Sequence, residues 1–491
     1  MQKETLQENK MGVMPVGKLL VNMALPMIIS MLVQALYNIV DSVYVSQVSE
    51  SAVTALSLAF PVQNMQIGFA VGVGVGVNAL LSQSLGRKDQ ESVNWAAGQG
   101  VFLALVATAL FMLFGFFGVR PYYTMQSTVA ETVEGGIAYT SICCIFTVGV
   151  FIQVLCERLL QATGRAMQTM ILQGTGAIIN IILDPVFIHG WWGMPRMGVA
   201  GAAIATVLAQ LISTVGCFLY AFSKYPELQL HRPDFAITKN DITQHIVQGV
   251  PLGLQFSVLS IGIITMQSVI VQFDMEAGRI VSSAAQTGFG AANRLHMLTM
   301  TPLNAFGTAM TSFTAQNLGA SKFDRIRRGS LQAALIMAIL CALSMAIGLL
   351  MTIDNAYFHI FLSADKITPE TIRYGNTFLY VDYATYLMLG GIFLMRNCDQ
   401  GIGRASYALI AGAAELVARI VVSTYLPAAI VGGAVSASAS PLAFYGLCAA
   451  DPAAWLVADI ALSIPFVKNI LRQDYRYLYG ERHHHKAEKD S

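Results

Sequence analysis

The chain has 491 residues, of which 55% are hydrophobic and only 12% are charged, and its mean hydropathy is +0.58. A water-soluble protein of this length needs more polar surface than this composition provides, so the sequence indicates a protein of the lipid bilayer. The formal net charge of +1, with no basic run interleaved with aromatic residues, excludes a general nucleic-acid binder.

The cysteines offer neither a metal site nor a disulfide framework. Seven are scattered through apolar stretches, and the one close pair, Cys143 and Cys144, is adjacent rather than spaced as CxxC. We expect them to be small packing residues, and we expect no cofactor. The first ten residues are charged and polar, so no cleaved signal peptide is predicted.

Twelve stretches are long and apolar enough to form helices that cross the hydrocarbon core, which takes about 20 residues each. The fold class predicted is therefore an all-α polytopic membrane protein. Prolines inside several spans each remove one backbone hydrogen bond and can bend the helix. The predicted spans are 18–46, 54–85, 94–118, 136–160, 166–189, 198–222, 245–273, 282–318, 330–353, 375–395, 405–427 and 451–470.

The distribution of Lys and Arg predicts the orientation. Twelve spans place both termini on the same side of the membrane. If that side is cytoplasmic, twenty-two Lys and Arg residues fall in inner segments, Arg158 and Arg396 among them, and only five in outer loops. This asymmetry follows the positive-inside rule, so both termini are predicted to be cytoplasmic. The five outer residues are Arg120, Arg196, Arg279, Lys366 and Arg373.

The two halves of the chain repeat each other across the polar segment between spans six and seven. "AQNLG" at 315–319 resembles "SQSLG" at 82–86, and "QGIGRA" at 400–405 resembles "QATGRA" at 161–166. A parallel repeat of six helices is typical of transporters that rock two bundles about a central cavity. The sequence therefore predicts two pseudo-symmetric six-helix bundles, residues 1–231 and 232–491.

Span one carries a polar stripe near its outer end. Gln34, Tyr37, Asn38 and Asp41 are spaced by three, four and seven residues, which places them on one helix face. Asp41 lies about 8–9 Å from the outer end of the span, at about 1.5 Å per residue.

Spans five and six bring matching groups to that depth. Asn180 and Asp184 are four residues apart on one face, and Thr206 in "GAAIATVLAQ" lies near the same level. Burial disfavours a charged carboxyl group, so protonation near neutral pH becomes feasible. The alternative occupant is Na+, with oxygen ligands from Asp41, Asn180, Asp184 and Thr206. A lone intramembrane Asp can be purely structural, but two at matched depth with polar companions favour ion coupling.

Four other ionisable residues within the spans have a more structural interpretation. Glu415 and Arg419, four apart in span eleven, are predicted to neutralise each other. Asp382 in span ten is read as an isolated acid that faces either the lumen or the boundary. Glu157, near the inner end of span four, is either a third cavity acid or a boundary charge.

Several of these stretches together resemble one family. "LPMIISMLVQALYNIVDSVYVSQ", "LLSQSLGRKD", "LLQATGRA", "NIILDPVFIHG", "GVAGAAIAT" and "FTAQNLGAS" resemble the multidrug and toxic compound extrusion (MATE) transporters, in particular their MepA-like and DinF-like branches. The resemblance implies two six-helix lobes around a V-shaped cavity, and export of amphipathic, often cationic compounds by antiport with H+ or Na+. It also implies ion coupling at Asp41, Asp184, Asn180 and Thr206.

The sequence departs from the NorM-like branch of that family in the second half. Span seven, "GLQFSVLSIGIITMQSVIVQF", has Gln255 and Gln267 but no carboxylate, so ion coupling is expected in the first lobe. The predicted substrate cavity comprises Gln34, Tyr37, Asn38, Gln153 and Glu157.

The prediction is thus a secondary active multidrug exporter, not an enzyme, that works by alternating access as a monomer in the cytoplasmic (inner) membrane of a bacterium or archaeon. Its partners are lipophilic cations and the bilayer, with no nucleic acid. One alternative is a flippase for lipid-linked precursors, which would favour a basic cavity. A remote alternative is an intramembrane aspartyl protease with Asp41 and Asp184 as its dyad, although neither a YD nor a GxGD context occurs.

Overall fold

The computed structural model describes residues 10–46, 48–126, 129–224 and 239–472, while the side chains of Tyr37, Asn38 and Asp41 lie outside this description. The chain forms two compact units. Unit 1 contains Met1–Gly253 and Ser312–Lys322, and unit 2 contains Leu254–Thr311 and Phe323–Ser491. The predicted lobe boundary between 231 and 232 falls outside the described residues and stays a prediction.

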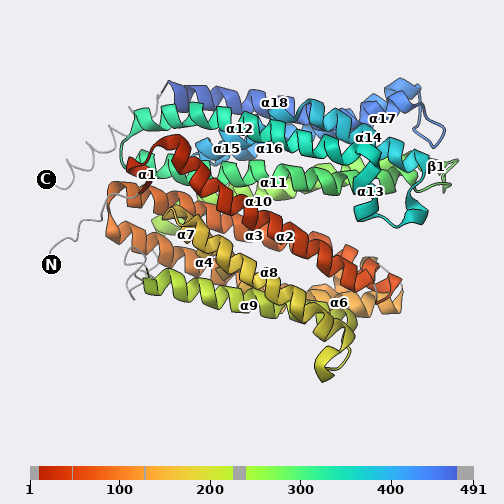
Figure 1. Ribbon diagram of the computed structural model, residues 1–491, viewed down its shortest axis with the longest axis horizontal. Helices are drawn as coiled ribbons and strands as arrows, with labels where there is room; N and C mark the ends of the chain where they lie inside the picture. Colours follow the sequence, from red (N-terminus) through yellow and green to blue (C-terminus); the bar gives the residue numbers. More distant parts are fainter. Residues whose placement is uncertain (1–9, 47, 127–128, 225–238, 473–491) are drawn as a thin grey trace. The chain divides into compact units, whose positions relative to one another are not determined.

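Unit 1 is a helical bundle whose core joins α3, α4, α7 and α9 (Figure 1). Two of its helices begin at side-chain caps: the Ser49 hydroxyl accepts from the Ala52 amide at 3.1 Å, and Asp89 accepts from the Ser92 amide at 3.3 Å. The helices are α1 (Lys10–Val13), α2 (Val16–Ser46), α3 (Glu50–Arg87), α4 (Gln90–Phe117), α5 (Val119–Gln126), α6 (Ala130–Ile145), α7 (Val148–Ala162), α8 (Ala166–His189), the 3₁₀ turn Trp191–Gly193 and α9 (Gly198–Lys224).

Unit 2 is built from the second half of the chain. Two long helices, α10 (Lys239–Gln272) and α11 (Ala284–Gly319), contribute residues to both units. The remaining elements are β1 (Met275–Glu276), β2 (Arg279–Ile280), α12 (Phe323–Thr352), the 3₁₀ turns Ile353–Asn355 and Ala364–Lys366, α13 (Ala356–Phe361), α14 (Pro369–Ala384), α15 (Tyr386–Gly401), α16 (Ser406–Val431), α17 (Pro441–Cys448), α18 (Ala450–Phe466) and the π-helical turn Val467–Leu471.

The helices account for the twelve predicted spans. Within the described residues, eight spans are long and apolar enough to cross a membrane, and two further spans are each formed by a bent pair of helices. α10 and α11 cover the two remaining predicted spans, 245–273 and 282–318. The predicted fold class, an all-α polytopic membrane protein, is confirmed.

Spans four and ten are bent, and their prediction as single continuous helices was wrong. α6 and α7 meet at an angle of 46°, and α14 and α15 meet at 55°. Neither break contains a proline. At the second break, the Thr385 hydroxyl donates to the carbonyl oxygens of Val381 at 3.4 Å and Asp382 at 3.2 Å. A side chain that inserts into the backbone ladder in this way is a recognised cause of a kink.

A two-stranded hairpin that the sequence analysis did not predict joins α10 to α11. β1 and β2 pair in antiparallel register, and the turn between them uses Ala277 and Gly278 with positive φ values of 50° and 78°. The Asp274 carboxylate accepts from the backbone amides of Ala285 at 3.0 Å and Gln286 at 2.9 Å. The hairpin and this cap fix the start of α11.

The repeated SQSLG and AQNLG motifs contact each other within unit 1. Gly86 of the first motif lies against the Gln316 carbonyl, and Gly319 of the second lies against the Gln83 carbonyl, so a Cβ at either glycine would clash. The contact is therefore reciprocal: each motif provides the small residue for the backbone of the other.

Two arginines that the orientation analysis counted in inner segments lie inside helices. Arg158 in α7 is 6% exposed and Arg396 in α15 is 9% exposed, because α7 and α15 extend through both positions. Removing them from the count leaves the inner excess of Lys and Arg intact. The orientation of the termini stays a prediction.

Candidate functional site

The acid of α8 is buried next to an amide on the same helix. Asp184 is 0% exposed and Asn180 is 3% exposed. The Asn180 Nδ2 donates to the Asp184 Oδ1 at 3.2 Å, as expected for residues four apart on one helix face. Pro185 follows inside the helix, so the local backbone lacks one hydrogen bond beside the acid.

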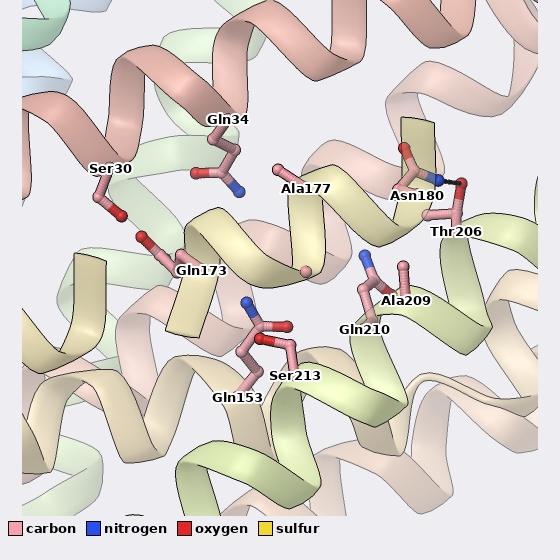
Figure 2. A pocket seen from close by; sticks show the side chains of 11 residues that line it. Ser30, Gln34, Gln153, Gln173, Ala177, Asn180, Thr206, Ala209, Gln210 and Ser213 are labelled. Carbon is pink, nitrogen blue, oxygen red and sulfur yellow. Dashed lines mark hydrogen bonds between the residues drawn. The ribbon is translucent and has the colours of Figure 1, made fainter. Parts of the chain in front are cut away.

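Asn180 also connects α8 to α9. Its Nδ2 lies 3.4 Å from the Thr206 Oγ1, the contact drawn as a dashed line in Figure 2. α8 packs against both α9 and α2. The predicted meeting of Asn180, Asp184 and Thr206 is therefore present in the structure, with the amide as the link between the acid and the hydroxyl.

The predicted contribution of α2 is described only in part. α2 is helical through the stripe of span one, but Asp41, Tyr37 and Asn38 have side chains outside the described residues. Their assignment to ion coupling and to the substrate cavity stays a prediction. Ser30 and Gln34, on the preceding turns, are described and face α8 (Figure 2).

A small cavity of about 30 Å³ lies among α2, α7, α8 and α9. It is smaller than the 300–1,000 Å³ or so that drug-sized ligands occupy, so entry of such a ligand requires the helices to separate. Four of the residues proposed from sequence line it: Gln34, Gln153, Asn180 and Thr206. The remaining lining residues are Ser30, Gln173, Gly176, Ala177, Ala209, Gln210 and Ser213.

Sequence reasoning missed four polar residues of this lining, although helical spacing contains the signal. Gln173 lies seven residues before Asn180 on α8, and Gln210 and Ser213 lie four and seven residues after Thr206 on α9. Ser30 lies four residues before Gln34 on α2. Each extends a face that the analysis had already identified.

Glu157 lies behind this lining, and its depth relative to the membrane boundary stays a prediction. It is 7% exposed and accepts hydrogen bonds from the Gln153 Nε2 at 3.1 Å and from the Gln173 Nε2. Its neighbour Arg158 instead donates to the Gln161 Oε1 at 2.9 Å. Two lining residues of the cavity, from α7 and α8, are thus held by one buried acid.

The oxygen-rich chemistry of the cavity suits a small hard cation or a proton. The Asn180 Oδ1 is buried and has no hydrogen-bond partner among the described residues. Asp184 and Thr206 provide further oxygens on the Nδ2 side of the same amide. Across the described part of the chain, no group of three or more His, Cys, Asp or Glu residues is placed to hold a metal ion.

The MatE family profile matches residues 26–186 and 259–425, which together make up more than half of the chain. This chain belongs to the MatE family. The matched segments include Asn180 and Asp184 of α8, and the family is one of membrane transporters.

Similar proteins agree with this membership of MatE. The chain is 23% identical over 74% of its length to "Probable multidrug resistance protein YoeA" of Bacillus subtilis, covering 77% of that protein. It is 24% identical over 82% of its length to an "FAD transporter" of Shewanella oneidensis, covering 86% of that protein. Among solved structures, a MATE protein in complex with MaL6 matches with a TM-score of 0.82 at 22% identity, over 93% of this chain and 98% of that one. This likeness shows the shared fold.

Unit 2 of this MatE protein contains a buried pair that the sequence analysis missed. Asp382 is not isolated: its Oδ2 lies 3.3 Å from the His296 Nδ1, and the two side chains are 0% and 9% exposed. The His296 ring stacks on Trp455, with the ring centroids 5.9 Å apart. The interpretation of Asp382 as a lone acid was wrong, because α11 brings a histidine to it from far along the chain.

The predicted pair of Glu415 and Arg419 is confirmed and is part of a longer ion network in unit 2. Arg419 Nη2 lies 3.2 Å from Glu415 Oε1, and its Nε lies 2.8 Å from Asp451 Oδ1. Arg396 Nη2 lies 3.5 Å from the other Glu415 oxygen. With its amide oxygen facing Arg396, Gln255 accepts from that guanidinium at 2.8–3.0 Å. Two arginines are thereby compensated by two acids and one amide.

Proposed function

We propose that this MatE protein is a secondary active multidrug exporter that couples the outward movement of amphipathic cations to the inward movement of H+ or Na+. The observation that carries the proposal is the buried contact of Asn180 with both Asp184 and Thr206 beside a cavity lined by polar side chains. A buried acid with oxygen-bearing neighbours can hold a proton or a cation reversibly, as a gradient-driven carrier requires. The relatives named for multidrug resistance support the type of cargo.

Coupling follows because the substrate and the ion compete for one chamber, the polar site around Asp184, Asn180 and Thr206. When Asp184 is unoccupied its negative charge favours a cationic substrate nearby, and when a proton or cation binds, the charge is neutralised and the substrate is released. Asp41 is proposed as the second acid of this chamber. Because α8 packs against α2 and α9, a change in occupancy acts on all three helices. Pro185 leaves the backbone at the acid free to bend.

We further propose that the protein works as a monomer in the cytoplasmic membrane with both termini in the cytoplasm. The cavity lining favours cationic cargo over the pyrophosphate of a lipid-linked precursor, because none of the described lining residues is basic. Proteolysis is tested directly by incubating the purified protein with a helical peptide substrate, and we expect no cleavage.

Transport in liposomes tests the coupling. With a pH gradient and a Na+ gradient imposed in separate trials, export of an ethidium-like dye by Asp184→Asn and by Asp41→Asn should fall by about tenfold or more. Coupling free energies between two ligands are typically about 1–3 kcal/mol, and the neutral amide removes the group that both ligands share. Whichever gradient drives the wild type identifies the ion.

The control is Asp365→Asn, which changes an exposed acid outside the predicted spans and should leave transport unaltered. Wild-type rates in both chamber variants, under either gradient, would show that the coupling ion does not bind at these acids.

A further inference from the structure

Three of the five side-chain amides that line the cavity of unit 1, those of Gln153, Gln173 and Asn180, donate to acids outside the lining. The Gln153 Nε2 of α7 and the Gln173 Nε2 of α8 both donate to the same Glu157 oxygen. Glu157 itself is not among the residues that line the cavity. Figure 2 shows both glutamines among the side chains around the cavity.

Asn180, seven residues after Gln173 on α8, likewise donates to an acid outside the lining. Its Nδ2 faces the Asp184 Oδ1 at 3.2 Å and the Thr206 Oγ1 at 3.4 Å. Its Oδ1 is buried and has no hydrogen-bond partner among the described residues. In Figure 2 this oxygen points away from Thr206. The Ser30 Oγ, 4% exposed, likewise has no partner among the described residues.

The orientation of these amides decides whether the lining offers donors or acceptors to a ligand. A side-chain amide has an NH₂ group that donates and an oxygen that accepts, whereas an ionised carboxylate only accepts. An acid behind an amide therefore takes up an N–H group and leaves the oxygen for a ligand. At Asn180 both N–H groups have partners, Asp184 and Thr206, so the oxygen is what remains for an occupant. At Gln153 and Gln173 one N–H group is bound to Glu157, and the oxygen and the second N–H group remain.

We propose that this cavity selects cations that carry N–H donors, namely protonated amines and amidines, over quaternary ammonium ions of the same charge and shape. A charged N–H group pairs with a buried amide oxygen in a charge-assisted hydrogen bond, which is about twice as strong as a neutral one. A quaternary ion offers only C–H groups and leaves the oxygen unpaired in a buried site, which is costly. The proposal rests on the cation export proposed above and specifies its substrate class.

Glu157 is a positioning residue in this scheme. It acts through Gln153 and Gln173, which would otherwise be able to turn their NH₂ groups toward the cavity. Its negative charge also attracts any cation, but this attraction is equal for two ligands of equal charge. The ratio of the affinities for these two ligands therefore reports the direction of the amides and does not depend on the charge of Glu157.

The test uses a matched pair of ligands: a naphthalene-tagged dimethylamine, protonated at pH 7, and its trimethylammonium derivative. Binding of each to the purified full-length protein is measured by fluorescence titration, which avoids leakage of the free amine through a bilayer. We expect the protonated amine to bind on the order of tenfold more tightly. Equal affinities, or tighter binding of the quaternary ion, overturn the inference.

The same ligands distinguish this inference from the proposed function. If both ligands bind equally and both are exported from liposomes, cation export stands and the selection by N–H donors is wrong. If neither ligand binds while the ethidium-like dye is still exported, the inference is wrong and cation export stands; if the dye is not exported either, both proposals fail.

Variants locate the cause of the preference. Glu157→Gln should lower the affinity ratio to the part that Asn180 provides, and Glu157→Asp should retain more of it. The matched control is Glu134→Gln, the same acid-to-amide change at an exposed position of unit 1, which should keep the wild-type ratio. If Glu157→Gln does not fold, Gln153→Leu removes one directed oxygen and should lower the ratio. A wild-type ratio in Gln153→Leu and in any folded Glu157→Gln contradicts the proposal.

Discussion

At the scale of single residues, the decisive contacts of unit 1 are made by amides. Asn180 contacts Asp184 on its own helix and Thr206 on α9, so one side chain links an acid to the neighbouring helix. A buried donor or acceptor that loses its partner costs more than the bond contributed. The position of each amide is therefore as important to the site as the acid itself.

The Thr206 hydroxyl can be tested without changing the shape of the side chain. Thr206→Val should lower gradient-driven dye export several-fold, while the free energy of unfolding falls by only about 1 kcal/mol, the usual contribution of one hydrogen bond. The transport assay in liposomes and thermal unfolding in detergent measure the two effects. Thr206→Ser keeps the hydroxyl and should transport close to wild type. Full activity in the valine variant would remove Thr206 from the coupling site.

The candidate site could be predicted from sequence only where polar residues stand out in an apolar helix. Asn180, Asp184 and Thr206 were found in this way, and the structure places Asn180 in contact with both others. Gln173 and Gln210 were missed, although they continue the same helix faces. The pairing of His296 with Asp382 could not be predicted, because no spacing rule relates residues on helices so far apart in the chain.

At the scale of helices, α16 depends on the compensation of its buried charges. Glu415 contacts both Arg419 and Arg396, at 3.2 and 3.5 Å, and all three side chains are largely buried. A buried ion pair contributes little net stability when it is complete, but removing one partner leaves a charge without compensation. Glu415 is the acid that two arginines share.

Glu415→Ala should therefore destabilise the protein by about 3–5 kcal/mol, seen as a lower midpoint of thermal unfolding in detergent. The comparison variant is Glu370→Gln, an exposed acid in the first turn of α14, where a change below about 0.5 kcal/mol is expected. If the two variants unfold at the same temperature, the network does not stabilise unit 2.

The helices were predictable, but their interruptions were not. Apolar length alone located the twelve spans, because a bilayer requires about 20 apolar residues in each. The bends at Phe146–Thr147 and at Thr385 carry no proline or glycine pair, so no breaker residue marked them in the sequence. The break at Thr385 depends on a hydroxyl that bonds to the backbone, and the same residue type occurs without effect in many helices.

At the scale of the whole molecule, the predicted orientation of the chain in the membrane can be measured by labelling single introduced cysteines. All seven native cysteines are buried, so they should give little background with a membrane-impermeant maleimide. Glu91→Cys lies in a predicted inner segment and Arg196→Cys in a predicted outer loop, and both positions are exposed.

In intact cells we expect the reagent to label Arg196→Cys and to spare Glu91→Cys, since the positive-inside rule places the second position in the cytoplasm. Permeabilised cells should show both labelled. The reverse pattern in intact cells would mean that the chain is inserted with its termini outside.

The two bends have a bearing on the history of the chain. Each lies about fifteen residues before one of the repeated motifs, QATGRA and QGIGRA, and at each break a threonine, Thr147 or Thr385, precedes the second helix. A bend at the same place in both halves, followed in each by the same motif, is what duplication of one bent span would leave. On that account, a six-helix ancestor already had the bend, and both halves have kept it.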